Sequence, residues 1–409
     1  MGCVIFLVFG QVFAPSLAYL GQVMSEPKPR MFVLTTTRLA IHFFFKPHLK
    51  ELDKYFDITL AFNPHLDDYL APLGLPVREF SVPLERKISP WNDLLALFKL
   101  TRFFWSERFD IVVTVVPKAG LLGMLAAWLT RVPLRVHIFQ GEVWASRQGS
   151  LRWLLKTIDG LTARLATHVL VVSASELAFL EKEGVVPFGK AKVLGSGSIC
   201  GVDTERFKLD PIARVRVRRE LGIPEQAIVC VFLGRLTFDK GLVELVKAFD
   251  LSASTQLDLW LLLAGPDEEK MQIRLRELVP EVVNQRILFS GFTQSPEQIL
   301  AASDFLCLPS HREGFGMVII EAAAVGVPAI GTRIHGITDA IEDRQTGLLV
   351  PLGDVGALAE AITLWSESPQ ALALYSKAAR ERVILKFEQQ KIVASYVEYF
   401  LELFPGKVQ

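Results

Sequence analysis

Residues 305–321 read FLCLPSHREGFGMVIIE, and this stretch decides both the expected fold and the expected site. Its first part is a short apolar run typical of a buried strand, and its last part opens a helix. Between them, Gly314 and Gly316 flank one aromatic residue, which allows a tight turn that exposes backbone N–H groups. The start of a helix also offers positive potential to a phosphate. The stretch therefore predicts an anion-binding turn between a strand and a helix.

Two glutamates bracket this turn. Glu313 precedes it, so its carboxylate is free to reach a sugar hydroxyl. Glu321 falls about one turn into the helix, where its carboxylate can accept hydrogen bonds from ribose hydroxyls. The alternative is an ordinary acidic pair on a helix surface. The glycines and the strand-to-helix context favour a binding role.

Working outward, apolar runs alternate with helical stretches along the whole chain after Met31. Such runs are typical of buried parallel strands. We expect strands at 31–37, 56–62, 109–116, 134–139, 167–173 and 191–197, then at 227–234, 257–265, 286–291, 305–309, 328–332 and 347–351. The pattern predicts an α/β protein with two doubly wound, Rossmann-like parallel-sheet domains that face each other across a cleft.

The domain boundaries follow from the same pattern. We expect an N-terminal domain over residues 25–200, a C-terminal domain over 201–387, and a last helix over 388–409 that packs back on the N-terminal domain. The join contains three glycines and then a basic stretch at 214–219. Residues 1–24 form an apolar segment without a charged side chain. Its length suits a membrane anchor, but translation from Met24 or Met31 is the favoured alternative, and the lack of a basic n-region counts against a signal peptide.

A second motif, GRLTFDKG, occupies residues 234–241 at the end of an expected strand. Arg235 and Lys240 flank its short loop, where the strand opens onto the cleft. A guanidinium fork and an ammonium group at that position can bind a diphosphate. Taken alone, two such cations are more often solvated surface residues.

These segments, together with LLLAGP at 261–266, SGF at 290–292 and the runs 303–332 and 336–351, resemble family 4 of the retaining glycosyltransferases. The resemblance covers the whole second half and includes the specific motif of two glutamates separated by seven residues. The first half is more loosely similar, through VLVVSASE at 169–176 and VLGSGSICGVDTERF at 193–207. The family's two-Rossmann architecture, the B-type glycosyltransferase fold, agrees with the expected fold class.

The resemblance implies a role for each matched residue. Arg235 and Lys240 bind the donor diphosphate, Glu313 contacts the donor sugar, and Glu321 contacts the nucleotide ribose. The nucleobase lies near the SGF segment. The remaining donor-site residues by this resemblance are Gly234, Gly291, Phe292, Gly314, Phe315, Gly316 and Met317. No cofactor and no metal are expected, since the chain lacks an Asp-x-Asp pair and the cations can offset the phosphate charge. The spacing of GSGSICG at 195–201 does not fit a nicotinamide fingerprint.

The first half departs from the family at the expected reactive centre. Many relatives have a His-Gly pair where this chain has Gln140-Gly141, and His137 lies three residues earlier. Glu142 is a candidate to orient the acceptor hydroxyl or to act as its base. His137 is either catalytic or a buried strand residue. The segment HIFQGEVWASRQG at 137–149 resembles a bacterial subgroup that builds capsule, O-antigen and other lipid-linked surface glycans.

Composition limits the partners. Lysine plus arginine and aspartate plus glutamate each total 44, so nothing favours nucleic acid. Residues 1–200 nevertheless carry 22 basic and 16 acidic side chains, and residues 94–106 read LLALFKLTRFFWS. A second basic and aromatic group contains Arg147, Arg152, Trp153 and Lys156. Such stretches suit an anionic membrane surface, although an ordinary core-facing helix is the alternative.

The four cysteines lie far apart, which fits a reducing compartment.

We therefore expect a cytoplasmic enzyme at the inner face of the inner membrane. It moves a sugar from a nucleotide diphosphate to a polyprenyl-diphosphate-linked sugar. The expected carrier is UDP, because UDP is the most common carrier in the family. Two alternatives stay open. One is a nucleotide-sugar 2-epimerase, which needs a similar donor pocket. The other is a subunit that binds nucleotide sugars without catalysis.

Overall fold

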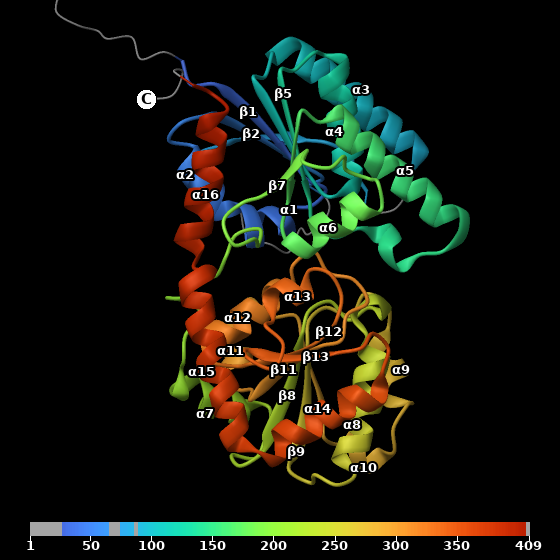
Figure 1. Cartoon of the computed structure of the whole chain (residues 1–409), viewed down its shortest axis with the longest axis vertical. Helices are drawn as coiled ribbons and strands as arrows, with labels where there is room; N and C mark the ends of the chain where they lie inside the picture. Colours follow the sequence, from blue (N-terminus) through green and yellow to red (C-terminus); the bar gives the residue numbers. More distant parts are fainter. Residues whose placement is uncertain (1–26, 65–73, 86–88, 406–409) are drawn as a thin grey trace, which may run out of the picture.

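The computed structural model describes residues 27–64, 74–85 and 89–405. Two α/β domains are stacked along the long axis of the molecule, and each is built on one parallel sheet (Figure 1). The expected apolar segment at 1–24 lies outside the described residues. Within the described ranges, no helix combines the length and the hydrophobicity needed to cross a bilayer.

The N-terminal domain contains a seven-stranded sheet in the order β3-β2-β1-β4-β5-β6-β7. Its strands are β1 (Arg30–Leu34), β2 (Asp57–Phe62), β3 (Arg78–Ser81), β4 (Ile111–Val115), β5 (Leu134–Phe139), β6 (His168–Val171) and β7 (Ala191–Val193). Its helices are α1 (Arg38–Ala40), the π-helix η2 (Ile41–Phe45), α2 (Lys46–Leu52), α3 (Pro90–Glu107), α4 (Pro117–Leu129), the short η3 (Val143–Ser146), α5 (Gly149–Leu165) and α6 (Ala174–Lys182).

The C-terminal domain contains a six-stranded sheet in the order β10-β9-β8-β11-β12-β13. Its strands are β8 (Ile228–Leu233), β9 (Leu259–Ala264), β10 (Ile287–Gly291), β11 (Phe305–Leu308), β12 (Ala329–Thr332) and β13 (Gly347–Val350). Its helices are α7 (Pro211–Glu220), the short η4 (Phe238–Lys240), α8 (Leu242–Ala253), α9 (Met271–Arg276), α10 (Glu281–Asn284), α11 (Pro296–Ala301), α12 (Met317–Val325), α13 (Ile337–Ala340), α14 (Val355–Glu367) and α15 (Pro369–Lys386).

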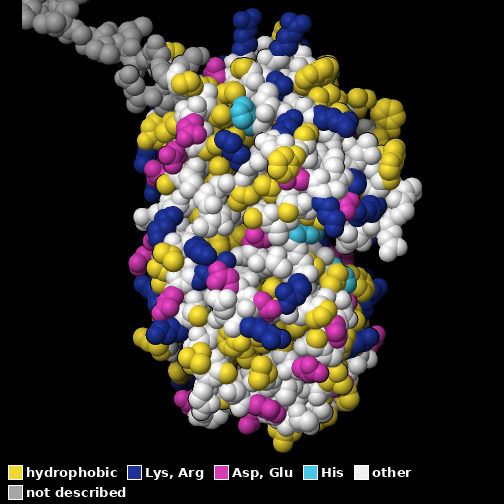
Figure 2. Space-filling view, in the orientation of Figure 1, with side chains coloured by type: hydrophobic (Ala, Val, Ile, Leu, Met, Phe, Trp, Pro, Cys, Tyr) yellow, Lys and Arg dark blue, Asp and Glu magenta, His cyan; other side chains and the backbone are white. Residues whose placement is uncertain are grey.

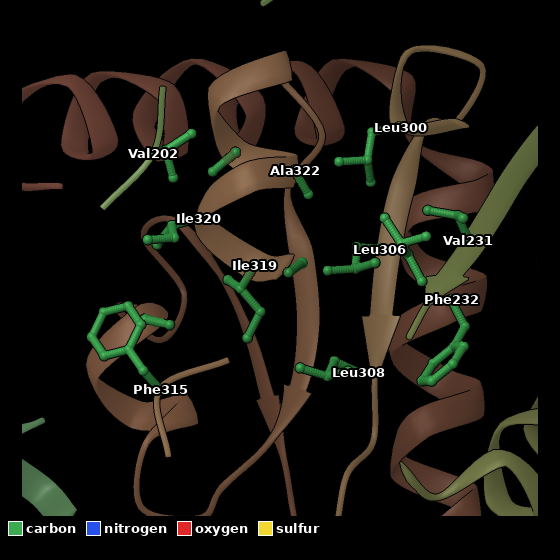
Figure 3. Packing of buried hydrophobic residues seen from close by; sticks show 14 of the residues in the cluster. Val202, Val231, Phe232, Leu300, Leu306, Leu308, Phe315, Ile319, Ile320 and Ala322 are labelled. Carbon is green, nitrogen blue, oxygen red and sulfur yellow. The ribbon is translucent and has the colours of Figure 1, made fainter. Parts of the chain in front are cut away.

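Hydrophobic burial on both faces of each sheet explains why these runs form central strands. In the N-terminal domain, Phe32 of β1 packs edge-on against Phe104 of α3, with 4.7 Å between the ring centroids. In the C-terminal domain, β8 and β11 bury Phe232 and Leu306 among the side chains of neighbouring helices (Figure 3). Each fully buried side chain of this size stabilises the fold by about 1.5–3 kcal/mol.

The last helix, α16 (Gln389–Glu402), leaves the C-terminal domain and runs along the N-terminal one (Figure 1). Tyr396 of α16 lies against His48 of α2, and Phe404 lies against Phe56. The chain also crosses between the domains beside this helix, where Val202 and Glu388 form an isolated bridge. Two chain crossings therefore connect the domains on one side of the molecule.

The order of the strands places a site in each domain. In both sheets the first strand in sequence lies next to the fourth, so the connections on its two sides run in opposite directions. Loops leave the carboxyl ends of two such strands on opposite sides and open a crevice there. In the C-terminal domain this crevice lies beyond β8 and β11, which precede GRLTFDKG and EGFGMVIIE.

The structure adds elements that the sequence analysis did not name. Strand β3 is one of them, because its residues REFS are mostly exposed and lack an apolar run. The basic stretch 214–219 is part of α7 and not a linker. Arg214 and Arg218 of this helix both bind Asp304, at 2.6 and 2.7 Å, which fixes α7 to the C-terminal domain.

Candidate functional site

A cleft of about 990 Å³ lies between the two domains, above the crevice of the C-terminal sheet. Its lining includes side chains from η2 and α2 of the N-terminal domain, from the crossing at 200–207, and from the loops after β8, β9, β10 and β11. Of the residues that the sequence singled out, the cleft is lined by Gly234, Arg235, Lys240, Phe292, Glu313, Gly316, Met317 and Glu321.

Both predicted cations lie at this crevice, and each is paired with a carboxylate. Arg235 follows β8 and contacts Glu268 at 2.8 Å. Lys240 lies in η4 and contacts Glu313, which follows β11, at 2.6 Å. The side chains of Lys240 and Glu313 are 16% and 14% exposed, so water screens this pair only partly. The unliganded site therefore contains two partly desolvated cations, each paired with a carboxylate. An anionic ligand could replace these carboxylates as the partner of each cation.

The turn before α12 has the shape that its sequence predicts. Gly316 has a φ of +68°, a conformation that favours glycine, and α12 begins at the next residue. The Ser310 hydroxyl donates to Glu313 at 2.8 Å, which fixes the carboxylate at the entrance of the turn. Phe315 is buried and packs against Phe387, so only the backbone of this residue is available to a ligand. Figure 3 shows its ring within the hydrophobic core.

Two contacts tie this turn to the loop after β8. Arg312 binds Asp239 at 3.0 Å, and the backbone N–H of His311 donates to the carbonyl of Asp239 at 2.9 Å. Gly241 closes the loop with a φ of +69°, where a Cβ would overlap the carbonyl oxygen of Pro309. The cationic loop and the glycine turn are thus held as one unit.

Glu321 lies one turn into α12 and lines the cleft. Burial raises the pKa of its carboxyl group to about 7, and the nearby cation Arg206 only partly opposes this effect. Such a group can either donate or accept a hydrogen bond near neutral pH. Phe292 also lines the cleft and is 39% exposed, whereas Gly291, at the end of β10, is exposed outside the lining.

The opposite wall comes from the N-terminal domain, and the sequence analysis missed it. The π-helix η2 and the start of α2 present His42, Phe43, Phe44 and Lys46 to the cleft. Burial, helped by the charge of Lys46, lowers the pKa of His42, which keeps its ring neutral. π-Helices often occur at functional sites. The signal was available, because TTTRLAIHFFFK follows directly from the carboxyl end of β1.

His137 lies in β5 and is buried beneath α4. Its Nδ1 forms a 2.8 Å hydrogen bond with the hydroxyl of Thr114, and burial lowers its pKa to about 3. A Cβ at Gly120 would overlap the ring, so the ring occupies space that the glycine of α4 provides. Since His137 is 1% exposed and does not line the cleft, its position is that of the buried strand residue.

Glu142 follows β5, at the interface between the domains. It is fully buried and, like His137, does not line the cleft. Its carboxylate lies 3.6 Å from Nε2 of His335, which belongs to the loop between β12 and α13. The role of Glu142 toward an acceptor hydroxyl stays a prediction, because in the present arrangement of the domains its side chain faces His335 and not the cleft.

Two glycines allow the two domains to touch at this point, and a third packs behind the turn within the C-terminal domain. A Cβ at Gly314 would lie 2.8 Å from the carbonyl carbon of Gln140, and a Cβ at Gly141 would lie 2.9 Å from the backbone nitrogen of Gly314. On the other side, a Cβ at Gly336 would lie 2.7 Å from the carbonyl oxygen of Glu313. The Gln140–Glu142 loop therefore rests directly on the turn that the sequence assigns to the donor.

Among the residues that the structure describes, no group of three or more histidine, cysteine, aspartate or glutamate side chains is arranged to hold a metal ion. The charged residues that line the described cleft include Arg235 and Lys240 and the glutamates Glu268, Glu313 and Glu321.

Comparison with known proteins identifies the family. Residues 56–197 match the family described as Glycosyl transferase 4-like domain, and residues 214–382 match Glycosyl transferases group 1. The chain is 30% identical over 329 residues to the capsular polysaccharide biosynthesis glycosyltransferase CapM of Staphylococcus aureus. This match covers 80% of this chain and 86% of CapM. It is 27% identical to an Escherichia coli UDP-Gal:alpha-D-GlcNAc-diphosphoundecaprenol alpha-1,3-galactosyltransferase, over 87% of this chain and 91% of that protein.

Among solved structures, Anabaena Alr3699/HepE, crystallised with UDP and glucose, aligns with a TM-score of 0.77 at 20% identity, over 91% of this chain and all of that one. This likeness confirms the two-Rossmann fold that the sequence predicted. Both halves of the chain match glycosyltransferase domains, and the match to CapM extends over most of both proteins. The chain is therefore a glycosyltransferase of the group 1 family, with a 4-like N-terminal domain, as the resemblance to family 4 had implied.

Proposed function

We propose that this enzyme is a retaining glycosyltransferase that moves a sugar from UDP to a lipid-linked saccharide during the assembly of a surface polysaccharide. The observation that carries the proposal is the convergence of Arg235, Lys240 and the N-terminus of α12 at the crevice between β8 and β11. Positive groups from three segments meet there, which suits a diphosphate better than a neutral ligand.

The proposed donor follows the order of groups along the cleft. The diphosphate lies between Arg235 and Lys240, and the sugar reaches Glu313. The ribose hydroxyls bind Glu321, and the uracil lies near Phe292. The E. coli relative is named for UDP-Gal, and the Anabaena structure holds UDP, which supports uridine as the base. N-acetylhexosamine, galactose and glucose all remain candidates for the sugar.

The proposed chemistry is a substitution at the anomeric carbon on the face of the leaving group. The bond between that carbon and the phosphate oxygen breaks, and its electron pair stays on the diphosphate. The acceptor oxygen forms the new bond, and its proton passes to a phosphate oxygen. Because negative charge grows on the diphosphate, cations fixed beside it stabilise the transition state more than the ground state. Arg235, Lys240 and α12 supply this charge without a metal or cofactor.

The proposed acceptor is a sugar on a polyprenyl diphosphate. Both protein relatives described above support this class: one is named for capsular polysaccharide biosynthesis and the other for a diphosphoundecaprenol acceptor. The same names favour transfer over epimerisation and over a binding subunit without catalysis.

A lipid acceptor requires a membrane surface, and we propose that helix α3 contacts the inner face of the inner membrane. One side of α3 exposes Trp91 at 83%, Phe98 at 64% and Trp105 at 73%. Lys99 and Arg102 are exposed beside them. Figure 2 shows hydrophobic and basic side chains close together at the upper right of the N-terminal domain, where α3 lies in Figure 1. Tryptophan with lysine and arginine suits the interface of an anionic bilayer.

The second basic and aromatic group contributes less to this surface. Trp153 is 69% exposed, but Arg152 and Lys156 both bind Glu183 and lie over the ring of Trp144. These two cations stabilise the N-terminal domain internally. The proposed membrane contact therefore depends on α3.

Transfer of radiolabelled sugar from a panel of UDP-sugars to polyprenyl-diphosphate-linked N-acetylglucosamine would test the function. Labelled lipid product with one donor and the full-length chain is the expected result.

Flotation with anionic vesicles would test the proposed membrane surface of α3. The Phe98→Ser/Trp105→Ser variant should float less than wild type, while Leu374→Ser, at an exposed position on α15, should float as wild type does. Equal flotation of all three proteins would exclude α3.

A further inference from the structure

Three acidic side chains are buried together beneath the loop that touches the donor turn. Glu142 follows β5, Glu176 lies in α6, and Asp159 lies in α5. Asp159 accepts a hydrogen bond from the indole N–H of Trp144 at 2.8 Å. Glu176 accepts hydrogen bonds from the backbone N–H groups of Gly141 and Val172. Glu142 differs, because neither of its carboxylate oxygens accepts a hydrogen bond from an N–H group among the described residues, and its neighbour within the N-terminal domain is the carboxyl group of Glu176.

A buried carboxylate without a partner costs stability unless another group balances its charge. The group that faces Glu142 is the imidazole of His335, which comes from the other domain. Its Nε2 lies 3.6 Å from Oε2 of Glu142, and this nitrogen has no other hydrogen-bond partner among the described residues. A shift of less than 1 Å would convert this contact into a hydrogen bond.

The ring of His335 is held in place by an aromatic stack. It lies on Phe179 of α6, with 4.2 Å between the centroids and 13° between the planes. Phe179 in turn lies on Trp144, at 5.2 Å and 18°. Since Phe179 and Trp144 belong to the N-terminal domain and His335 to the C-terminal one, the stack crosses the domain interface.

The charges around the pair favour an interaction. Burial, reinforced by Glu142, raises the pKa of Glu176 well above its usual range, so Glu176 keeps its proton near neutral pH. Burial likewise raises the pKa of Asp159 to about 7. Glu142 therefore shares this buried site with two acids of its own domain whose pKa values are raised. Asp339, the other acid near this loop, binds Ser175.

We propose that His335 is a positioning residue, which holds the Gln140–Glu142 loop over the Glu313–Gly314 turn by its contact with Glu142 across the domain interface. The neighbouring residue Gly336 touches the carbonyl oxygens of Glu313 and Gly314, and Gly141 touches Gly314 from the other side. Three backbone segments are therefore stacked in the order Gln140–Glu142, Glu313–Gly314 and His335–Gly336. The side chains of Glu142 and His335 connect the two outer segments, and the middle segment contains Glu313, the proposed sugar-binding residue. The inference rests on the proposed transfer reaction, because it assigns the loop to covering the donor sugar.

The experiment is a double-mutant cycle on turnover with His335→Ala, Glu142→Ala and the combined variant. Each single variant should lower kcat by about 10- to 100-fold, because a small displacement of the loop misplaces the reacting groups. UDP affinity should change less than twofold, since Arg235 and Lys240 are untouched. The combined variant should be no slower than the worse single variant. His335→Gln keeps a hydrogen-bond donor toward Glu142 and should recover part of kcat.

The matched control is His168→Ala, which removes an imidazole that contacts Tyr399 far from the interface. It should keep kcat within twofold. The proposal would be overturned if the losses of kcat in the two single variants multiplied in the combined variant, or if kcat and UDP affinity fell equally. It would also be overturned if a lower unfolding temperature of the variants accounted for their whole loss of kcat. A wild-type chain that binds no UDP would instead contradict the proposed function, so the two failures are distinguishable.

Discussion

The ammonium group of Lys240 lies 2.6 Å from Oε1 of Glu313, although the two residues follow different strands. The resemblance to family 4 implies that Lys240 binds the donor diphosphate and that Glu313 contacts the donor sugar. In the unliganded protein they neutralise each other at the place where these two parts of the donor would meet. Binding of the diphosphate would therefore exchange one anion for another around Lys240, and Glu313 would be released to the sugar hydroxyls.

Replacing Lys240 by alanine should lower kcat by about 100-fold or more, as for other lost anion stabilisers. The loss should fall mainly on kcat, because the developing charge appears in the transition state. Lys247→Ala, on the exposed side of the following helix, is the matched control and should keep wild-type turnover. Steady-state kinetics would check both variants, and an unchanged kcat in Lys240→Ala would remove this residue from the mechanism.

Glu321 should make donor binding depend on pH. Burial raises its pKa to about 7, and only the ionised carboxylate can accept hydrogen bonds from both ribose hydroxyls. The Kd for UDP-glucose should therefore rise about tenfold from pH 8 to pH 6. Glu321→Gln should bind more weakly at pH 8 and show a flatter profile. Titration calorimetry at both pH values would measure this, and a wild-type Kd that is the same at pH 6 and pH 8 would exclude the role.

Gly314→Ala should push the domains apart. Its Cβ would lie 2.8 Å from the carbonyl carbon of Gln140 and 3.0 Å from the nitrogen of Gly141. We expect turnover to fall by about 100-fold, because the loop after β5 leaves the donor turn. Gly356→Ala, in helix α14 where the nearest neighbour of the Cβ is 3.5 Å away, should remain active. Small-angle X-ray scattering should show a wider particle only for Gly314→Ala, and an unchanged profile would contradict the packing.

Asp159 should make stability fall as the pH rises. Its pKa is raised by burial to about 7, so the native state holds a proton that the unfolded chain releases near pH 4. The stabilisation is complete below pH 4 and is lost as the pH rises through 7. In Asp159→Asn the drop in unfolding temperature between pH 5 and pH 8 should shrink by a few degrees. Asp258→Asn, at an exposed carboxylate, should reproduce the wild-type drop. A wild-type drop in Asp159→Asn would show that Asp159 titrates normally.

Much of the fold could be predicted from the sequence, because central strands are continuous apolar runs. LRVHIF forms β5 without a shift, and IVCVFL and LWLLLA form β8 and β9. Strand β3 escaped prediction because it lies at the sheet edge and carries charged residues. The residues of helix α7 were placed in the join between the domains as a basic stretch, whereas Arg218 is 3% exposed and bound to Asp304.

The site could be predicted only where local sequence shapes it. The glycine turn and the two cations depend on short motifs, and the structure brings them together around one cleft. For His42 and Phe43 on the opposite wall, the sequence shows only that their segment follows the carboxyl end of β1, and their position across from the donor turn depends on how the domains face each other. His335 is the extreme case, since its partner Glu142 lies in the other domain and no spacing relates the two.

The account's central claim is that the cleft binds a nucleotide diphosphate through Arg235 and Lys240. Titration calorimetry of UDP into the wild-type protein and into Arg235→Ala/Lys240→Ala is its most direct test. We predict one site per chain in the wild type and a loss of affinity of at least about 100-fold in the double variant, from the loss of two charge-assisted contacts. Equal binding by the two proteins, or no binding by the wild type, would contradict the claim.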